Sequence, residues 1–222
     1  MPPMRNGRTP CAAHSRTTDR IRTLSSIEYF YAGYSAFAYL GHEELLRIAR
    51  ASGRKIDHKP FDLRKLLTTT GAQPFAARSN AHKDYFFGRE IERWAAYRGI
   101  PVMTGTPRYH AHDITLSNCM LIAGLVQVVD IDKLAHEMLR AHWVDDFDLD
   151  NPDDLRRIGH RAGVDPAPLL GAAGSEEVQR IYRQNTEEAI DRSIFGSPTY
   201  FVDGDMFYGQ DRLELIAHTL KI

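Results

Sequence analysis

The apolar positions near the start of the chain predict a strand, a helix and a second strand in succession. Residues 27–31 (IEYFY) are rich in aromatic and β-branched residues and are bounded by polar ones, which is the pattern of a buried strand. A helix is predicted over about residues 37–52, because apolar residues recur there at helical spacing and Gly53 stands where a C-terminal cap belongs. Residues 55–60 (KIDHKP) predict the second strand.

The last thirty residues predict two further strands and a closing helix. Pro198 directly precedes the apolar run 200–202, and Asp203-Gly204 is a hairpin turn signal, because glycine tolerates the positive φ of a two-residue loop. Residues 206–208 predict the returning strand, and an amphipathic helix follows. This β-β-α ending resembles the end of thioredoxin-like folds, in which the proline before the strand is cis and faces the active site.

Between these two ends the pattern is helical throughout. We expect helices over about residues 85–98, 116–129, 131–143, 153–162 and 175–192. The predicted fold class is therefore α/β: a thioredoxin-like βαβ…ββα unit over residues 25–62 and 193–222, interrupted by a large all-helical insertion over residues 63–192. We expect the insertion to cover the cleft between the first helix and Pro198.

Residues 1–24 differ in kind from the rest of the chain. They contain five arginines, a single acidic residue and no apolar run. A secretory signal would need an apolar core of about 7–15 residues. We expect a disordered basic extension, although its acid-poor composition also resembles a transit peptide.

Composition narrows the class of protein. The 222 residues have a formal net charge of -1 and 43% hydrophobic residues, which predicts a globular protein without a nucleic-acid-binding surface. No apolar run approaches the roughly 20 residues of a membrane span, so no membrane partner is expected. Cys11 and Cys119 are too far apart in sequence and context to suggest a disulfide framework, which favours a reducing, cytoplasmic compartment.

Ser35 stands at the junction between the first strand and the first helix. Its hydroxyl either caps the helix or points at a ligand, since a helix N-terminus favours a negatively charged group.

Five motifs in order along the chain resemble those of 2-hydroxychromene-2-carboxylate isomerases, relatives of kappa-class glutathione transferases in the DsbA-like superfamily. They are YFYAGYSAFAYLG at residues 29–41, Lys83 before ERWA at 92–95, GIP at 99–101, HWV at 142–144 before an acidic stretch, and F-G-x-P-T with G-Q-D-R-L at 195–213. The resemblance covers nearly all of residues 27–220. Redox members of the superfamily carry C-x-x-C at the first helix, whereas residues 35–38 (SAFA) contain no sulfur.

The resemblance implies a glutathione-dependent enzyme with Ser35 as its catalytic residue. A free cysteine thiol has a pKa of about 8.5, and lowering that pKa by about two units needs roughly 2.7 kcal/mol of differential stabilisation. A hydroxyl donor at a helix N-terminus supplies energy of that order. Ser35 would therefore stabilise the glutathione thiolate without itself being the nucleophile; the alternative is a plain helix cap.

The resemblance also implies a set of glutathione contacts. The backbone N–H and C=O of Ser197, before Pro198, would bind the cysteinyl part as an added strand does. Asp211 would pair with the γ-glutamyl ammonium, with Gln210 beside it. Lys83 would meet the glycyl carboxylate or an anionic substrate. The alternatives are a first-turn acid for Asp211 and a solvated surface charge for Lys83.

Three positions depart from the family pattern. Ala32 stands where the family has aspartate, Ala36 where it has proline, and Ala72 where it has an asparagine that contacts the ligand, unless Gln73 substitutes. These departures bear on the substrate and on the affinity for glutathione.

Two clusters have metal-like residue types without a metal motif. His110-Ala111-His112-Asp113 lies in a connecting segment, and residues 145–150 are acidic without the glycine and closing glutamate of an EF-hand. No metal site is expected.

The predicted activity is cis–trans isomerisation of an aromatic conjugated enone, through reversible addition of the bound glutathione thiolate. Two alternatives remain open: a kappa-type transferase or peroxidase, and a thioredoxin-like binding protein that has lost catalysis. The resemblance implies a small aromatic substrate and a homodimer.

Overall fold

The computed structural model describes residues 26–73 and 77–222, so the basic extension expected over residues 1–24 lies outside the described residues. The strands are β1 (Ile27–Tyr31), β2 (Ile56–Pro60), β3 (Thr199–Val202) and β4 (Asp205–Tyr208). The α-helices are α1 (Ala36–Ser52), α2 (Leu63–Thr69), α3 (Asn80–His82), α4 (Glu90–Arg98), α5 (Thr115–Val126), α6 (Asp132–Asp145), α7 (Pro152–Ala162), α8 (Pro166–Ala173), α9 (Glu176–Asp191) and α10 (Leu213–Leu220).

The strands form one sheet in the order β2-β1-β3-β4. β1 and β2 are parallel, while β3 is antiparallel to both β1 and β4. A parallel pair needs a crossover connection, which α1 supplies, whereas the short Asp203-Gly204 turn joins the antiparallel β3 and β4. The predicted thioredoxin-like βαβ…ββα unit with a helical insertion is confirmed.

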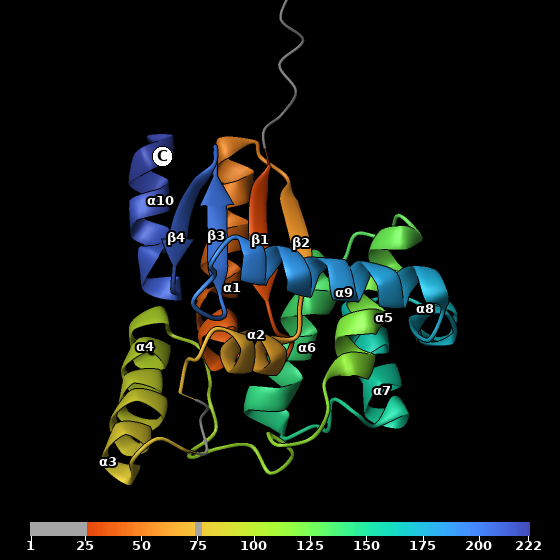
Figure 1. The fold of residues 1–222 in the computed structure, drawn as a ribbon, viewed down its shortest axis with the longest axis horizontal. Coiled ribbons are helices and arrows are strands. Elements are labelled where there is room, and N and C mark those ends of the chain that lie inside the picture. Colours follow the sequence, from red (N-terminus) through yellow and green to blue (C-terminus); the bar gives the residue numbers. More distant parts are fainter. Residues whose placement is uncertain (1–25, 74–76) are drawn as a thin grey trace, which may run out of the picture.

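Alternate residues of β1 face two different cores. Tyr29 and Tyr31 belong to the large core on the side of α1, and Phe30 belongs to a smaller core with Phe61 and Phe201. This follows from the two-residue period of a strand. Figure 1 shows α9 and α2 in front of the sheet and α1 behind it. β1 is therefore buried on both faces and anchors the whole domain.

The sequence patterns located α1, α4 to α7, α9 and α10, but they did not single out α2, α3 or α8 and they missed one local distortion. The expected helix over residues 85–98 is a π-helix (Lys83–Arg89) that continues into α4. The backbone N–H of Glu90 bonds the carbonyl of Tyr85, five residues back. The apolar pattern predicted an uninterrupted α-helix, because it does not distinguish a single wide turn from the regular period. Within the described ranges none of the helices has the length and apolar character needed to cross a bilayer.

A series of hydrogen-bonded polar side chains crosses the core between the sheet and α6. The Tyr29 ring stacks on Tyr31 at 4.1 Å and on Tyr200 at 5.3 Å between centroids. The Tyr31 hydroxyl lies 3.1 Å from His58 Nδ1, and His58 Nε2 lies 2.9 Å from the Asp132 carboxylate. The hydrogen bond from His58 holds the pKa of Asp132 below its usual range. These hydrogen bonds satisfy the polar groups of Tyr31 and His58, whose burial without partners would cost free energy.

His42 in α1 completes this layer. It is fully buried, and its Nε2 donates to the Asp132 carbonyl at 3.1 Å. Burial, reinforced by the nearby His58, lowers the pKa of His42 to about 3. The histidine is therefore uncharged in the folded protein at neutral pH.

The buried histidine makes stability depend on pH. Its folded pKa of about 3 lies below the unfolded value of about 6.5, so the unfolded state binds more protons between these limits. We expect the free energy of unfolding to fall as the pH drops below about 6.5, with a contribution from His42 of up to about 1.4 kcal/mol per pH unit. His42→Gln keeps a donor for the Asp132 carbonyl and should flatten this dependence in urea unfolding measured from pH 7 to 4. The same substitution at exposed His218 is the control, and an equally steep curve in His42→Gln would contradict the account.

Candidate functional site

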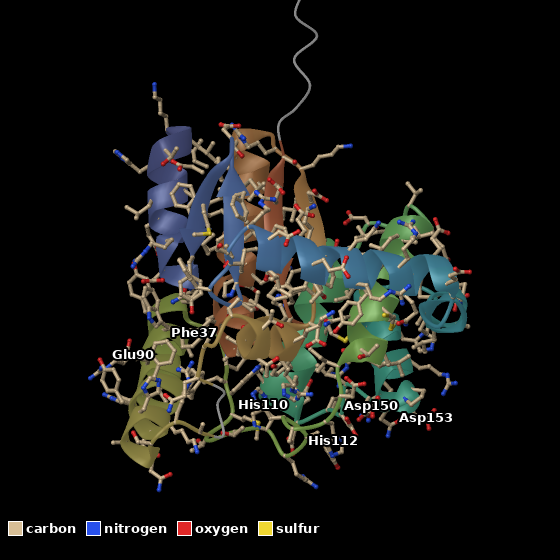
Figure 2. All side chains as sticks on the ribbon, in the orientation of Figure 1. Phe37, Glu90, His110, His112, Asp150 and Asp153 are labelled. Carbon is tan, nitrogen blue, oxygen red and sulfur yellow. The ribbon has the colours of Figure 1, made fainter. Side chains whose placement is uncertain are left out.

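A cavity of about 190 Å³ lies where α1 begins and where the chain approaches β3. Its walls are mostly aromatic, formed by Tyr34, Phe37, Phe86, Phe87, Trp143, Phe195 and Tyr208. Its polar side chains are those of Ser35, Arg78, His110 and Ser197. The strand-end loops form the floor and the insertion forms the opposite wall, as the sequence predicted. Figure 2 shows Phe37 and His110 below the sheet, on the side where α1 begins.

A second, more open groove of about 1180 Å³ lies between α1, α4 and α6. Charged side chains of both signs line it, and neither Ser35 nor Ser197 contributes. The smaller cavity is the candidate site, because it contains the helix N-terminus and the serines on which the predicted chemistry depends.

Ser35 is both a helix cap and a link to the other end of the chain. Its Oγ accepts a hydrogen bond from Ala38 N at 3.2 Å and donates one to the Ser197 carbonyl at 3.0 Å. The side chain is buried within the cavity wall. The two sequence-based interpretations of Ser35, cap or ligand-facing hydroxyl, are thus compatible with one geometry.

The loop before β3 is held in place from two sides. Ser197 Oγ accepts a hydrogen bond from Ala32 N at 3.0 Å, and the Pro198 carbonyl accepts one from Gly209 N at 3.0 Å. The Ser197-Pro198 peptide bond is cis, which confirms the expectation from the sequence. These contacts place the Ser197 backbone directly against the start of α1.

The N-terminus of α1 favours a negative charge. Its first turn contains no acidic side chain, so nothing within the helix compensates the positive end of the dipole. The backbone N–H groups of Ala36 and Phe37, which both line the cavity, have no acceptor within the helix. The site is therefore suited to an anion at the cavity floor.

Two side chains from the insertion support the β1–α1 loop, and the sequence did not single them out for this role. Asn118 Oδ1 accepts from Gly33 N at 3.0 Å, and its Nδ2 donates to the Phe61 carbonyl at 3.2 Å. Trp143 Nε1 donates to the Tyr34 carbonyl at 2.8 Å. An asparagine in an otherwise nearly apolar helix is the signal that would have pointed to such a buried polar contact.

Arg78 is a further residue that the sequence did not single out. It is the one lysine or arginine among the described residues that line the cavity. Its Nε donates to the Gln73 carbonyl at 3.1 Å, and its guanidinium lies 5.3 Å from the centroid of the Phe87 ring. Burial raises the pKa of Tyr208, which also lines the cavity, and the positive charge of Arg78 opposes this rise. Arg78 gives the aromatic cavity one positive side.

The other predicted ligand residues are not among those that line the cavity. Lys83 begins the π-helix, and the ion pair of Asp211 with Arg212 measures 2.7 Å. Asp211 nevertheless acts electrostatically on Tyr208, which lines the cavity. Pro198 sits directly after Ser197. The structure thus brings Ser35, Ser197 and Pro198 together, whereas Lys83 and Asp211 do not line the cavity.

Gln210 faces a different part of the molecule. Its side chain is buried, and its Oε1 accepts from Arg98 Nε at 3.0 Å and from Arg98 Nη2 at 2.7 Å. Its Cβ also approaches Gly41 of α1 closely. This side chain links α4 to the core.

The metal-like motif is divided between separate partners. His110 Nδ1 lies 3.0 Å from His142 Nε2, and His112 Nδ1 lies 2.9 Å from the Asp148 carboxylate. Over residues 26–73 and 77–222, no three potential metal ligands gather at one point. Cys119 is buried in α5, and burial raises the pKa of its thiol to about 11, so it is not a reactive thiolate.

The bracing role of Asn118 can be tested directly. Asn118→Ala would leave Gly33 N and the Phe61 carbonyl without this partner, and we expect a loss of about 1–3 kcal/mol in the free energy of unfolding. The control is Asn80→Ala at an exposed position, which should change stability by less than about 0.5 kcal/mol. Equal urea midpoints for the two variants would show that Asn118 does not hold this loop.

Comparisons with known proteins agree with this fold. The DSBA-like thioredoxin domain family model matches residues 26–221. The 2-hydroxychromene-2-carboxylate isomerase of Sphingobium xenophagum is 27% identical over 197 residues, which are 88% of this chain and 97% of that protein. Glutathione S-transferase kappa 1 of Rattus norvegicus is 26% identical over 205 residues, 87% of this chain and 90% of that protein.

A solved structure of a 2-hydroxychromene-2-carboxylate isomerase has the same fold. It superposes with a TM-score of 0.72 at 22% identity and covers 88% of this chain and 94% of its own. Residues 26–221 include the whole sheet, the cavity and the insertion, so the family match extends over every element described above. The chain therefore belongs to the DSBA-like thioredoxin domain family, with distant homologues among 2-hydroxychromene-2-carboxylate isomerases and kappa-class glutathione transferases.

Proposed function

We propose that this protein is a glutathione-dependent isomerase of the 2-hydroxychromene-2-carboxylate isomerase type. The observation that carries the proposal is the Ser35 hydroxyl, held between the N-terminus of α1 and the Ser197 carbonyl on the floor of an aromatic cavity. It lies where a bound thiolate would meet a hydroxyl donor and two backbone N–H groups at once.

Glutathione binding would exchange one hydrogen bond for two. The Ser35 hydroxyl now donates to the Ser197 carbonyl at 3.0 Å. By rotating about its Cβ–Oγ bond, it would donate to the cysteinyl sulfur instead. The Ser197 carbonyl would then accept the cysteinyl N–H of the tripeptide, as an added strand does. No backbone movement is required for this exchange.

The energies involved are adequate for thiolate formation. A pKa lowered by about two units corresponds to roughly 2.7 kcal/mol. A hydrogen bond to a charged group contributes about 1.5–3 kcal/mol, and a helix N-terminus about 0.3–1 kcal/mol or more when partly buried. Ser35 and the first turn of α1 together therefore account for a largely ionised thiol at neutral pH.

The isomerisation itself needs little from the protein beyond the thiolate. The sulfur adds to the conjugated carbon of an aromatic enone, which turns the double bond into a single bond. Rotation about that bond follows, and elimination of the same thiolate restores the double bond in the other geometry. Glutathione is regenerated, and the aromatic walls hold the ring of the substrate while the conjugated side chain of the substrate rotates.

The remaining ligand contacts are part of the proposal. Asp211 would pair with the γ-glutamyl ammonium after releasing Arg212, and Lys83 would approach a carboxylate from the π-helix. Arg78, which lines the cavity, is the better placed cation for an anionic aromatic substrate. Gln210 would not contact the ligand; its buried side chain would position the segment that carries Asp211. A homodimer remains a prediction.

A kappa-type transferase is the second candidate function, because the rat kappa-class relative is nearly as similar as the isomerase. The same thiolate would then displace a leaving group or add irreversibly to an electrophile. Measuring free glutathione separates the two reactions, because conjugation consumes it and isomerisation does not. A third candidate is a binding protein without catalysis, motivated by Ala32, Ala36 and Ala72; it predicts binding without a lowered thiol pKa.

The decisive experiment compares glutathione binding and ionisation in the wild type and Ser35→Ala. Calorimetry measures binding, and an ultraviolet difference titration measures the thiolate. We expect the bound thiol pKa to lie about two units below the free value in the wild type and to return toward it in the variant. Turnover of a chromene carboxylate should fall about 10²- to 10³-fold.

The matched control is Ser175→Ala, because Ser175 caps α9, a helix whose residues do not line the cavity. It should lose a similar capping energy, about 1 kcal/mol, without changing the thiol pKa. If the wild type does not bind millimolar glutathione, both enzyme functions are wrong as stated.

A further inference from the structure

The Tyr208 side chain lines the cavity, and the proposed thiolate chemistry does not use its hydroxyl. Tyr208 belongs to β4, where it pairs with Thr199 of β3. A Cβ placed on Gly196 would lie 3.0 Å from the Tyr208 hydroxyl oxygen, so the hydroxyl lies against the backbone just before Ser197. The carbonyl of Ser197 accepts the Ser35 hydroxyl. The phenol therefore belongs to the part of the cavity in which the proposed chemistry takes place.

The Tyr208 ring is held at a defined place in the cavity wall. Glycine at position 196 makes room for it, because the ring atoms Cε2 and Cζ lie 3.1 and 3.4 Å from the same Cβ position. The backbone beneath the ring is fixed, since the Thr199 hydroxyl donates to the Gly196 carbonyl at 2.8 Å. The Phe195 ring packs edge-on against Tyr208 at 5.7 Å between centroids. The position of the hydroxyl is thus determined by three neighbours.

The Tyr208 phenol keeps its proton at neutral pH and can donate it to a ligand. Burial raises the pKa of Tyr208, the positive charge of Arg78 opposes this rise, and the negative charge of Asp211 adds to it. Among the residues that the structure describes, none forms a hydrogen bond with the Tyr208 hydroxyl. Tyr208 is 43% exposed, so a molecule in the cavity can reach the ring. The hydroxyl is a donor without a protein acceptor.

Besides the thiolate, the proposed isomerisation needs a group that accommodates charge on the carbonyl oxygen of the enone. A sulfur lone pair forms the C–S bond to the β-carbon. The π pair of the C=C bond then joins the α-carbon to the carbonyl carbon, and the π pair of the C=O bond moves onto oxygen. The product is an enolate in which the former double bond is single and rotates. Elimination reverses each shift and returns the electron pair to sulfur.

We propose that the Tyr208 hydroxyl donates a hydrogen bond to the carbonyl oxygen of the enone and stabilises the enolate that thiolate addition forms. The inference rests on the proposed function for the identity of the reaction, and it makes Tyr208 a second catalytic residue beside Ser35. The proton stays on the phenol throughout. The hydrogen bond strengthens as negative charge develops on the substrate oxygen, which is how an oxyanion donor lowers the barrier.

Other donors in the cavity are engaged elsewhere. The Ser35 hydroxyl and the N-terminus of α1 serve the sulfur. Arg78 Nε donates to the Gln73 carbonyl at 3.1 Å, and Arg78 Nη1 lies 2.8 Å from His82 Nε2. The positive charge of Arg78 nevertheless assists Tyr208, because it makes the phenol more acidic than burial alone would. A more acidic phenol is a stronger hydrogen-bond donor to an enolate.

The kinetic test compares Tyr208→Phe with the wild type in the turnover of a chromene carboxylate with glutathione. Removing one oxyanion donor from an enclosed site costs about 10²- to 10³-fold in kcat. Because water can reach this half-exposed position, we expect kcat to fall by about 10- to 10²-fold. The affinity for glutathione and the pKa of its bound thiol should stay unchanged. Tyr97→Phe removes the hydroxyl of an exposed tyrosine in α4 and should retain full turnover.

A binding test examines the same hydrogen bond without turnover. 4-Nitrophenolate carries an oxyanion conjugated to an aromatic ring, and its absorbance reports binding to the full chain at mildly alkaline pH, where the probe is an anion. We expect the wild type to bind it about tenfold more tightly than Tyr208→Phe does, a difference of about 1.4 kcal/mol and the size of one hydrogen bond to a charged group. Tyr97→Phe should bind it as tightly as the wild type.

The two tests distinguish the inference from the proposed function. Equal kcat values in the wild type and Tyr208→Phe, equal affinities of the two proteins for 4-nitrophenolate, or no binding of this probe at millimolar concentration would overturn the role of Tyr208. A weaker affinity for glutathione at unchanged kcat would also overturn it and make Tyr208 a glutathione contact. If the wild type binds no glutathione but binds 4-nitrophenolate through Tyr208, the glutathione-dependent reaction is rejected and the oxyanion donor stands.

Discussion

The hydrogen bond from the Ser35 hydroxyl to the Ser197 carbonyl joins residues 162 positions apart, and the candidate site depends on it. A second bond, from Ala32 N to Ser197 Oγ, joins the same two loops. Together they hold the positive end of α1 against the backbone that precedes the cis Pro198. The pairing of β1 with β3 brings the two loops to the same end of the sheet, and the two serines set the distance between the loops.

The helical insertion covers this end of the sheet and so encloses the cavity. It contributes the aromatic wall that includes Phe86 and Trp143, the cation of Arg78 and the imidazole of His110. It also stabilises the floor, because Asn118 and Trp143 bond the backbone of the β1–α1 loop. The thioredoxin-like unit thus contributes the N-terminus of α1 to the cavity, and the insertion contributes most of its aromatic wall.

Local sequence patterns were sufficient for the strands, for α1 and for the position of Ser35 at the start of α1, because these follow from residues that are neighbours in sequence. The cis proline followed from the resemblance of the chain's end to thioredoxin-like folds. The roles of Asn118 and Arg78 and the pairing of His110 with His142 do not follow in this way, because each contact involves a partner that is distant in sequence or a cavity that exists only once the insertion has packed. The direction of the Gln210 side chain is another such case, since Arg98 and the core beside Gly41 decide it. The roles of Lys83 and Asp211, the domain boundaries and the dimer remain predictions.

A crystal structure of the protein with glutathione would test the central claim most directly. The account predicts that the cysteinyl sulfur lies within hydrogen-bonding distance of Ser35 Oγ and over the first turn of α1. The Ser197 carbonyl should then accept a hydrogen bond from the cysteinyl N–H in place of the Ser35 hydroxyl. A sulfur bound elsewhere, with Ser35 still donating to Ser197, would contradict it. In that case Ser35 would be a structural link between the two loops, and the chemistry of the cavity would have to come from another group.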